Sequence, residues 1–193
     1  LTPTSYINVD KLIEILFSTV EDALEEGKGN DEIGDTEKRT VKTNRQEIDI
    51  TRNKSIESFE KKFNVKLIKN TRALYWDESK KIRVASIVSK RYVDDRIPYW
   101  YAYHPRYQNF FKDGEKCYLL VCCTDKNKTY AIPSDIMNKQ VEFLNSTPPD
   151  LSNVKEGDKY YWHLHIKDDD DKMILVVPKN NSTLSLEEFV CEY

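Results

Sequence analysis

Residues 117–123 read CYLLVCC, and this run predicts the most deeply buried strand of the chain. Successive side chains of a strand point to opposite faces, so Cys117 and Cys123 share one face and Cys122 points to the other. Cysteine in an apolar strand behaves as a small hydrophobic residue. The chain has no C-x-x-C pair with zinc-site spacing. We therefore expect reduced, structural thiols inside a sheet.

The elements on either side of this strand predict an α+β fold. Apolar residues recur at strand or helix spacing through most of the chain beyond residue 54. The expected elements are a helix over 55–63, strands over 66–76 and 81–92 with a turn at 77–80, a strand over 99–104, a helix after Pro105, strands over 117–123 and 129–132, a helix over 133–144, a hairpin of strands over 160–166 and 173–178, and a closing helix over 184–190. We expect a central mixed or antiparallel sheet flanked by helices.

The N-terminal part of the chain differs from this core in composition. Residues 8–26 carry apolar side chains at helical spacing and predict an amphipathic helix, which must pack on its own domain or on a partner. Residues 27–54 are polar and indicate a linker or an extended arm. Apolar and charged residues alternate at 45–51, which allows a strand there. We therefore divide the chain into a helix with a polar arm, 1–54, and an α+β core domain, 55–193.

Composition excludes several classes of protein. The 193 residues include only 5 Gly, so the glycine-rich phosphate loops of kinases, NTPases and dehydrogenases are not expected. No apolar run is long enough to cross a bilayer. No charged-then-apolar leader opens the sequence, so we expect a cytoplasmic protein with no membrane contact.

The net charge of −3 conceals an uneven distribution. Residues 1–35 carry two basic and nine acidic side chains, residues 36–96 carry seventeen and nine, and residues 97–193 carry eleven and fifteen. A segment with a net charge of +8 therefore lies between flanks of −7 and −4. Such a basic centre is typical of a polyanion-binding surface. It is equally consistent with a solvated face onto which the acidic arm folds.

The segment over 90–107 combines aromatic and cationic side chains. Alternation gives its strand two faces, which are Tyr99-Tyr101-Tyr103 and Trp100-Ala102-His104. A nucleic-acid base would stack on Trp100 or Tyr101, depending on which face is exposed. The cations that would contact phosphates are Lys90, Arg91, Arg96 and Arg106. The alternative is that these aromatic residues only fill the core.

Two further patterns invite a metal interpretation, and neither is complete. His163 and His165 fall on one strand face, but a metal needs a third ligand, and none is adjacent in sequence; His104 would supply it if the strands are neighbours. A polar outer face explains the same pair. The aspartates at 168–171 lack the ligand spacing and the closing Glu of a calcium loop, so they indicate a solvated turn. We expect no metal site.

Four stretches carry a resemblance to a known group of proteins. They are IRVASIVSK at 82–90, YWY at 99–101, CYLLVCC at 117–123 and YAIPS at 130–134. Together with the element order over 55–123, they resemble the core of the restriction-endonuclease-like proteins, the PD-(D/E)xK group. The resemblance implies a role in bacterial DNA restriction, repair or mobile-element systems.

The resemblance also implies positions for the catalytic residues of that group. Its nucleases hold Mg²⁺ with an Asp and a Glu, and a Lys after the Glu steadies the attacking water. Asp77 or Glu78 stands where the Asp is expected and Lys90 where the Lys is expected, but residues 86–88 supply no Glu. Glu47 or Asp49 would have to substitute for it.

We therefore expect a DNA-binding accessory or specificity domain of a bacterial restriction or defence system, without catalysis and without a cofactor. One alternative is a divergent Mg²⁺-dependent nuclease acting through Asp77 and Lys90. Another is an interaction module whose helix over 8–26 docks a protein partner or forms a homodimer.

Overall fold

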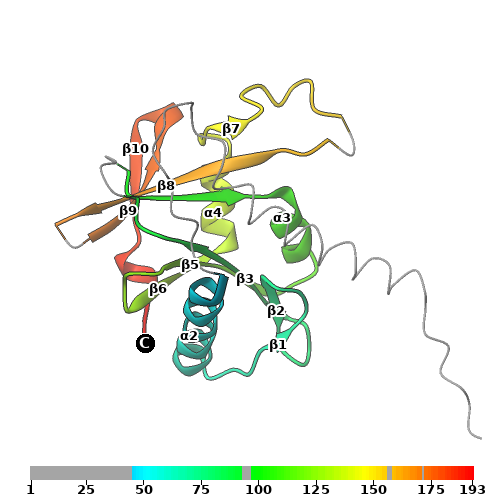
Figure 1. Cartoon of the computed structure of the whole chain (residues 1–193). Coiled ribbons are helices and arrows are strands. Elements are labelled where there is room, and N and C mark those ends of the chain that lie inside the picture. Colours follow the sequence, from blue (N-terminus) through cyan, green and yellow to red (C-terminus); the bar gives the residue numbers. More distant parts are fainter. Residues whose placement is uncertain (1–44, 93–96, 156–157, 171) are drawn as a thin grey trace, which may run out of the picture.

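The computed structural model describes residues 45–92, 97–155, 158–170 and 172–193, which form two β-sheets and three α-helices (Figure 1). The helix expected over 8–26 and most of the expected arm lie outside the described residues. The α+β prediction is confirmed. The strands divide between two sheets, however, where a single central sheet was expected.

The first sheet has six strands and is mixed. In spatial order they are β1 (Ile68–Lys69), β2 (Leu74–Trp76), β3 (Ile82–Ser89), β5 (Lys116–Cys123), β6 (Lys128–Pro133) and β11 (Val190–Glu192). β3 and β5 pair in parallel, and the other neighbouring pairs are antiparallel. A parallel pair needs a long crossover connection, which the chain between β3 and β5 supplies.

The second sheet is antiparallel throughout. In spatial order its strands are β10 (Ser182–Ser185), β9 (Lys172–Val177), β8 (Tyr161–Asp169) and β4 (Tyr99–Tyr103), and β7 (Ser146–Thr147) also pairs with β8. β4 belongs to the crossover between β3 and β5. The crossover therefore leaves the first sheet and adds a strand to the second.

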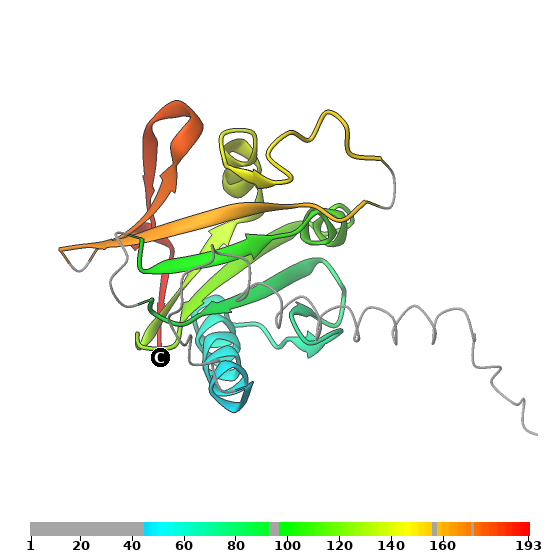
Figure 2. The same cartoon turned by 45° about the horizontal axis from the view of Figure 1, so that its top comes forward.

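The helices divide between the two faces of the first sheet. α2 (Arg45–Phe63) covers the face that points away from the second sheet, as Figures 1 and 2 show. α3 (Pro105–Phe111) buries Tyr107, and α4 (Ser134–Val141) buries Met137, in the core that the two sheets share. The molecule is therefore layered as α2, the first sheet, the main core and the second sheet.

β5 serves two separate cores because its side chains alternate. Leu119 faces the second sheet and Leu120 faces α2, and both are fully buried. The predicted division of the cysteines is confirmed, with Cys117 and Cys123 in the main core and Cys122 under α2. All four cysteines of the chain are free and buried. Burial raises the pKa of the Cys123 thiol to about 12, which keeps it protonated and structural.

The alternating residues at 45–51 do not form a strand, because they are the first part of α2. In this part of α2, one carboxylate pairs with a cation of the same helix and with a cation of a separate loop. Arg52 is only 2% exposed, and its guanidinium lies 3.2 Å from the Asp49 carboxylate. Arg72, from the loop before β2, approaches the same carboxylate at 3.1 Å. The expected domain boundary at residues 54 and 55 consequently falls inside a helix.

The closing helix expected over 184–190 is also wrong. The chain there continues β10, makes a 3-10 turn over Glu187–Phe189 and enters β11. The main chain of β10 is bonded to β9, so it cannot make helical hydrogen bonds. A second 3-10 turn, Pro178–Asn180, joins β9 to β10. The strand expected over 66–76 is likewise divided into β1 and β2, which pair with each other.

Gly114 lies where a larger residue does not fit. A Cβ atom at this position would overlap the Cys117 Sγ atom and lie 3.1 Å from two Arg83 side-chain carbons. We expect Gly114→Ala to lower the free energy of unfolding by about 1–3 kcal/mol, measured by urea denaturation. The double variant Gly114→Ala, Cys117→Ala should recover part of this loss. Strictly additive losses would contradict the overlap.

Candidate nucleic-acid interface

The outer face of the second sheet carries a group of aromatic side chains from β4 and β8. Trp100 pairs with His165 across the two strands. Tyr161 and His163 lie on the same face of β8, because they alternate with buried Trp162 and its inward neighbours. We call Trp100, Tyr161, His163 and His165 the aromatic row. All four are half-buried, so they stand at the surface with α2 on the far side of the molecule.

The rings of the aromatic row contact one another. Tyr161 and His163 are stacked, with ring centroids 5.5 Å apart and 25° between their planes. Trp100 lies edge-on to both, at 6.1 Å and 84° from Tyr161 and at 5.7 Å and 71° from His163. His163 and His165 are 5.8 Å apart. Perpendicular and offset arrangements are favourable for aromatic pairs. The row is therefore an ordered surface that exists before any ligand binds.

The pKa values of His163 and His104, two of the histidines on this face, are lowered. Burial lowers the pKa of His163, and its Nε2 atom lies 2.8 Å from the Thr147 hydroxyl. Burial, followed by the positive charge of Arg106, lowers the pKa of His104 to about 4. His104 packs against Tyr161 at 5.4 Å, at the end of the row. Near neutral pH these rings present apolar faces and no charge.

Cations stand at both ends of the aromatic row. Lys167 is exposed and follows His165 on the same face of β8. At the other end, Arg106 and the exposed Lys159 are close enough to His104 to lower its pKa. Arg106 also lies over the Tyr107 ring at 5.1 Å. Aromatic rings flanked by cations are suited to stacking bases and binding phosphates, although the exposed Asp169 lies on the same face beyond Lys167.

Tyr101 points into the molecule and is only 3% exposed. Its hydroxyl donates a hydrogen bond to the Cys122 carbonyl oxygen at 3.0 Å and lies 3.2 Å from the Cys123 Sγ atom. The alternation predicted for 99–104 is confirmed, and it leaves Trp100, not Tyr101, at the surface.

Arg91 is engaged by acidic residues. Its Nη1 atom lies 2.8 Å from Asp168 Oδ2 and 3.7 Å from Asp125, and it donates a hydrogen bond to the Tyr99 hydroxyl at 3.0 Å. Lys126 also pairs with Asp168, at 2.9 Å. Hydrogen bonds from Arg91 and then Lys126 lower the pKa of Asp168, so it stays ionised. The charge of Arg91 is therefore largely compensated within the protein.

Lys90 and Arg106 are the other expected phosphate contacts that the structure describes. Lys90 follows the last residue of β3, with its Nζ atom 5.5 Å from the centre of the Tyr92 ring. Arg96 lies outside the described residues. Of the four cations expected from the sequence, Arg106 is the one described beside the aromatic row. Lys159 and Lys167 were not singled out by their sequence context.

The residues implied for a nuclease centre are not brought together. Asp77 precedes β3 and Lys90 follows it, so the eight residues of the strand separate them. Asp77 instead closes its own turn by accepting hydrogen bonds from the Ile82 amide at 2.8 Å and from Ser79. Burial raises the pKa of Asp77, but these hydrogen bonds outweigh it, and the net shift is downward. The Asp77 carboxylate therefore has a structural role, which is to hold the turn before β3.

The carboxylates considered as substitutes lie on α2. Asp49 pairs with Arg52 and Arg72, and Glu47 stands exposed two residues earlier. Among the residues that the structure describes, no three His, Cys, Asp or Glu side chains are grouped to hold a metal ion.

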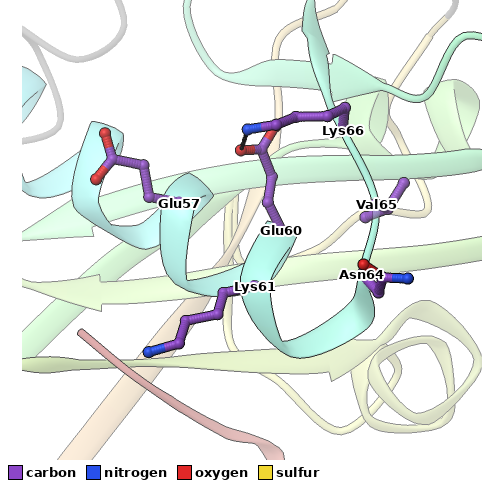
Figure 3. Close-up of a pocket in the computed structure, with 6 residues that line it drawn as sticks. All are labelled: Glu57, Glu60, Lys61, Asn64, Val65 and Lys66. Atoms are coloured by element: carbon purple, nitrogen blue, oxygen red, sulfur yellow. Dashed lines mark hydrogen bonds and ion pairs between the residues drawn. The ribbon is translucent and has the colours of Figure 1, made fainter.

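A shallow hollow of about 340 Å³ lies at the C-terminal end of α2 (Figure 3). Glu60 stands in it and accepts hydrogen bonds from Lys66 Nζ at 2.8 Å and from the Leu67 amide at 2.7 Å. The hollow has no aromatic side chain among the residues that line it. Its polar groups hold the chain as it leaves the helix, and it is separated from the aromatic row by both sheets.

Comparisons with known proteins leave the function to be inferred from these residues. No family model, curated protein or solved structure matches the chain. Within the described ranges, no helix combines the length and the apolar character needed to cross a membrane.

Proposed function

We propose that this protein binds nucleic acid, and DNA in particular, through the aromatic row, without cleaving it. The observation that supports this most is the position of Trp100, which is half-buried on the outer face of β4 with two rings set against it. Stacking on aromatic rings contributes about 1–3 kcal/mol per base and tolerates any base sequence.

The charges around the row support the same proposal. Lys167 at one end and Arg106 and Lys159 at the other are placed to neutralise phosphates on either side of stacked bases. Neutral His163 adds ring surface without a charge that would need a counterion. Phosphate contacts position a nucleic acid, and they make its affinity depend on salt.

We further propose that the protein is an accessory or specificity domain of a bacterial restriction or defence system. The resemblance over residues 55–123 supports this setting, and the separation of Asp77 from Lys90 by the length of β3 supports a role without catalysis. One difference from that resemblance is that β4 pairs with β8 of the second sheet.

Replacing Trp100 by alanine tests the proposal. We expect Trp100→Ala to weaken binding to fluorescein-labelled DNA roughly tenfold to hundredfold in an anisotropy titration, because one stacking ring is lost. Affinity of the unaltered protein should fall linearly with salt on a double-logarithmic plot. With Mg²⁺ present, we expect the DNA to remain intact.

Trp76→Ala is the matched control for this experiment. Trp76 is also a half-buried tryptophan, but it lies on β2 of the first sheet, stacked on Phe110 at 5.9 Å. Its replacement should leave the affinity unchanged within about twofold. Equal losses in the two variants, or no DNA binding by the unaltered protein at low salt, would refute the proposal.

A further inference from the structure

We infer that the aromatic row takes unpaired bases, so that its ligand is a single-stranded segment of nucleic acid. This inference rests on the proposed function and adds the class of ligand. In a duplex the faces of the bases are stacked on one another, and only their edges are accessible in the grooves. A surface that works by stacking therefore needs bases that are already unpaired.

The shape of the row favours stacking over reading base edges. Its rings lie on a sheet face and pack against one another at 5.5–6.1 Å, so they do not project as a wedge or a helix would. His163 Nε2 is already engaged by the Thr147 hydroxyl. Reading a base edge in the major groove depends on donors and acceptors carried by a helix or a ribbon that enters it.

The row is also rigid before binding. Two nearly perpendicular ring contacts, from Tyr161 and His163, fix the plane of the Trp100 indole. Trp100 and His163 come from two strands held in register by the pairing of Ala102 with His163. A rigid ring loses little freedom when a base stacks on it, which favours affinity.

The length of the row sets the number of bases. From Tyr161 to His165 the strand advances by four residues, about 13 Å at the usual strand rise. Sheets that bind single strands stack two or three bases over a surface of this kind. Lys167 continues the line of β8 beyond His165, and Lys159 precedes Tyr161. A strand lying along β8 would therefore place two or three bases on the rings and its phosphates near a cation at each end.

Three labelled probes of equal length test the inference: a mixed-sequence DNA single strand, the duplex formed with its complement, and an abasic strand that keeps only sugars and phosphates. We expect the single strand to bind at least about tenfold tighter than the duplex or the abasic strand. Trp100→Ala should reduce single-strand binding to about the level of the abasic strand and leave abasic binding unchanged. An RNA strand of the same sequence shows whether the sugar is also distinguished.

A charge variant separates stacking from phosphate attraction. Lys167 is exposed, so Lys167→Glu should fold normally, and we expect it to weaken all three DNA probes by a similar factor. If duplex binds as tightly as single strand and both depend on Trp100, the inference fails but the proposed function stands. If none of the probes binds, or all bind equally and independently of Trp100, both fail. Circular dichroism and thermal unfolding confirm that each variant is folded.

Discussion

Replacing Phe59 by alanine should lower the free energy of unfolding by about 3–5 kcal/mol. Phe59 is fully buried between α2 and the first sheet. Its ring stacks on Phe63 at 4.4 Å and meets Tyr118 edge-on at 5.2 Å. Alanine would remove both contacts and leave a cavity that the rigid sheet cannot close. Urea denaturation followed by circular dichroism measures the loss.

Glu57→Ala is the matched control on the same helix. Glu57 is exposed two positions before Phe59, so its replacement should change the unfolding free energy by less than about 0.5 kcal/mol. A loss below about 1 kcal/mol for Phe59→Ala would contradict the close packing of α2 on the sheet. It would mean that the core between α2 and the first sheet contributes little to the stability of the fold.

Acid should destabilise the protein through His104. Burial and then the charge of Arg106 lower the pKa of this histidine from 6.5 to about 4 in the folded state. Between those two values the unfolded chain binds a proton that the folded chain does not, so stability falls as the pH is lowered through this window. The lowered pKa of His104 contributes about 3 kcal/mol to the free energy of unfolding. About 2 kcal/mol of this contribution should be lost between roughly pH 7.5 and pH 5.

His104→Asn isolates this contribution. The variant loses packing against Tyr107 and Tyr161 at every pH, so the comparison uses the change in stability between the two pH values. That change should be about 2 kcal/mol smaller in the variant than in the unaltered protein. An identical pH dependence in the two proteins would show that His104 is not held neutral by its surroundings.

Sequence patterns predicted the elements of the main core well. The run at 117–123, the strand over 99–104 and the hairpin ending near Val177 are all strands, with alternating burial along β4 and β9 and burial of both faces in β5. Alternation also predicted which side of β5 each cysteine faces. These signals are local, because strand periodicity depends only on which side of one strand is buried.

Features that depend on distant partners could not be predicted in the same way. The first half of α2 has the composition of a linker, and Asp49 there pairs both with buried Arg52 and with Arg72 from a separate loop. The division into two sheets is equally non-local, since no property of β4 alone indicates that it pairs with β8. β10 becomes a strand through its pairing with β9 in the same way.

The candidate site depends partly on local strand patterns and partly on distant strand pairing. Sequence alternation separated Trp100 from Tyr101 but could not say which face is exposed, and burial of Tyr101 decides it. Tyr161 joins the site only through the pairing of β4 with β8. One sequence pattern could have indicated this surface, because both strands carry aromatic residues or histidines at alternate positions. Two such faces form one surface when their strands are neighbours.

The position of β4 has a consequence for how this protein can evolve. The outward side chains of β4 and β8 lie outside both cores, while the inward ones, such as Tyr103 and Leu164, are almost completely buried. Substitutions on the outward side therefore change the exposed surface and leave the side chains of both cores unchanged. Descendants of one ancestral chain can therefore differ at Trp100 and its neighbours while they inherit the same scaffold.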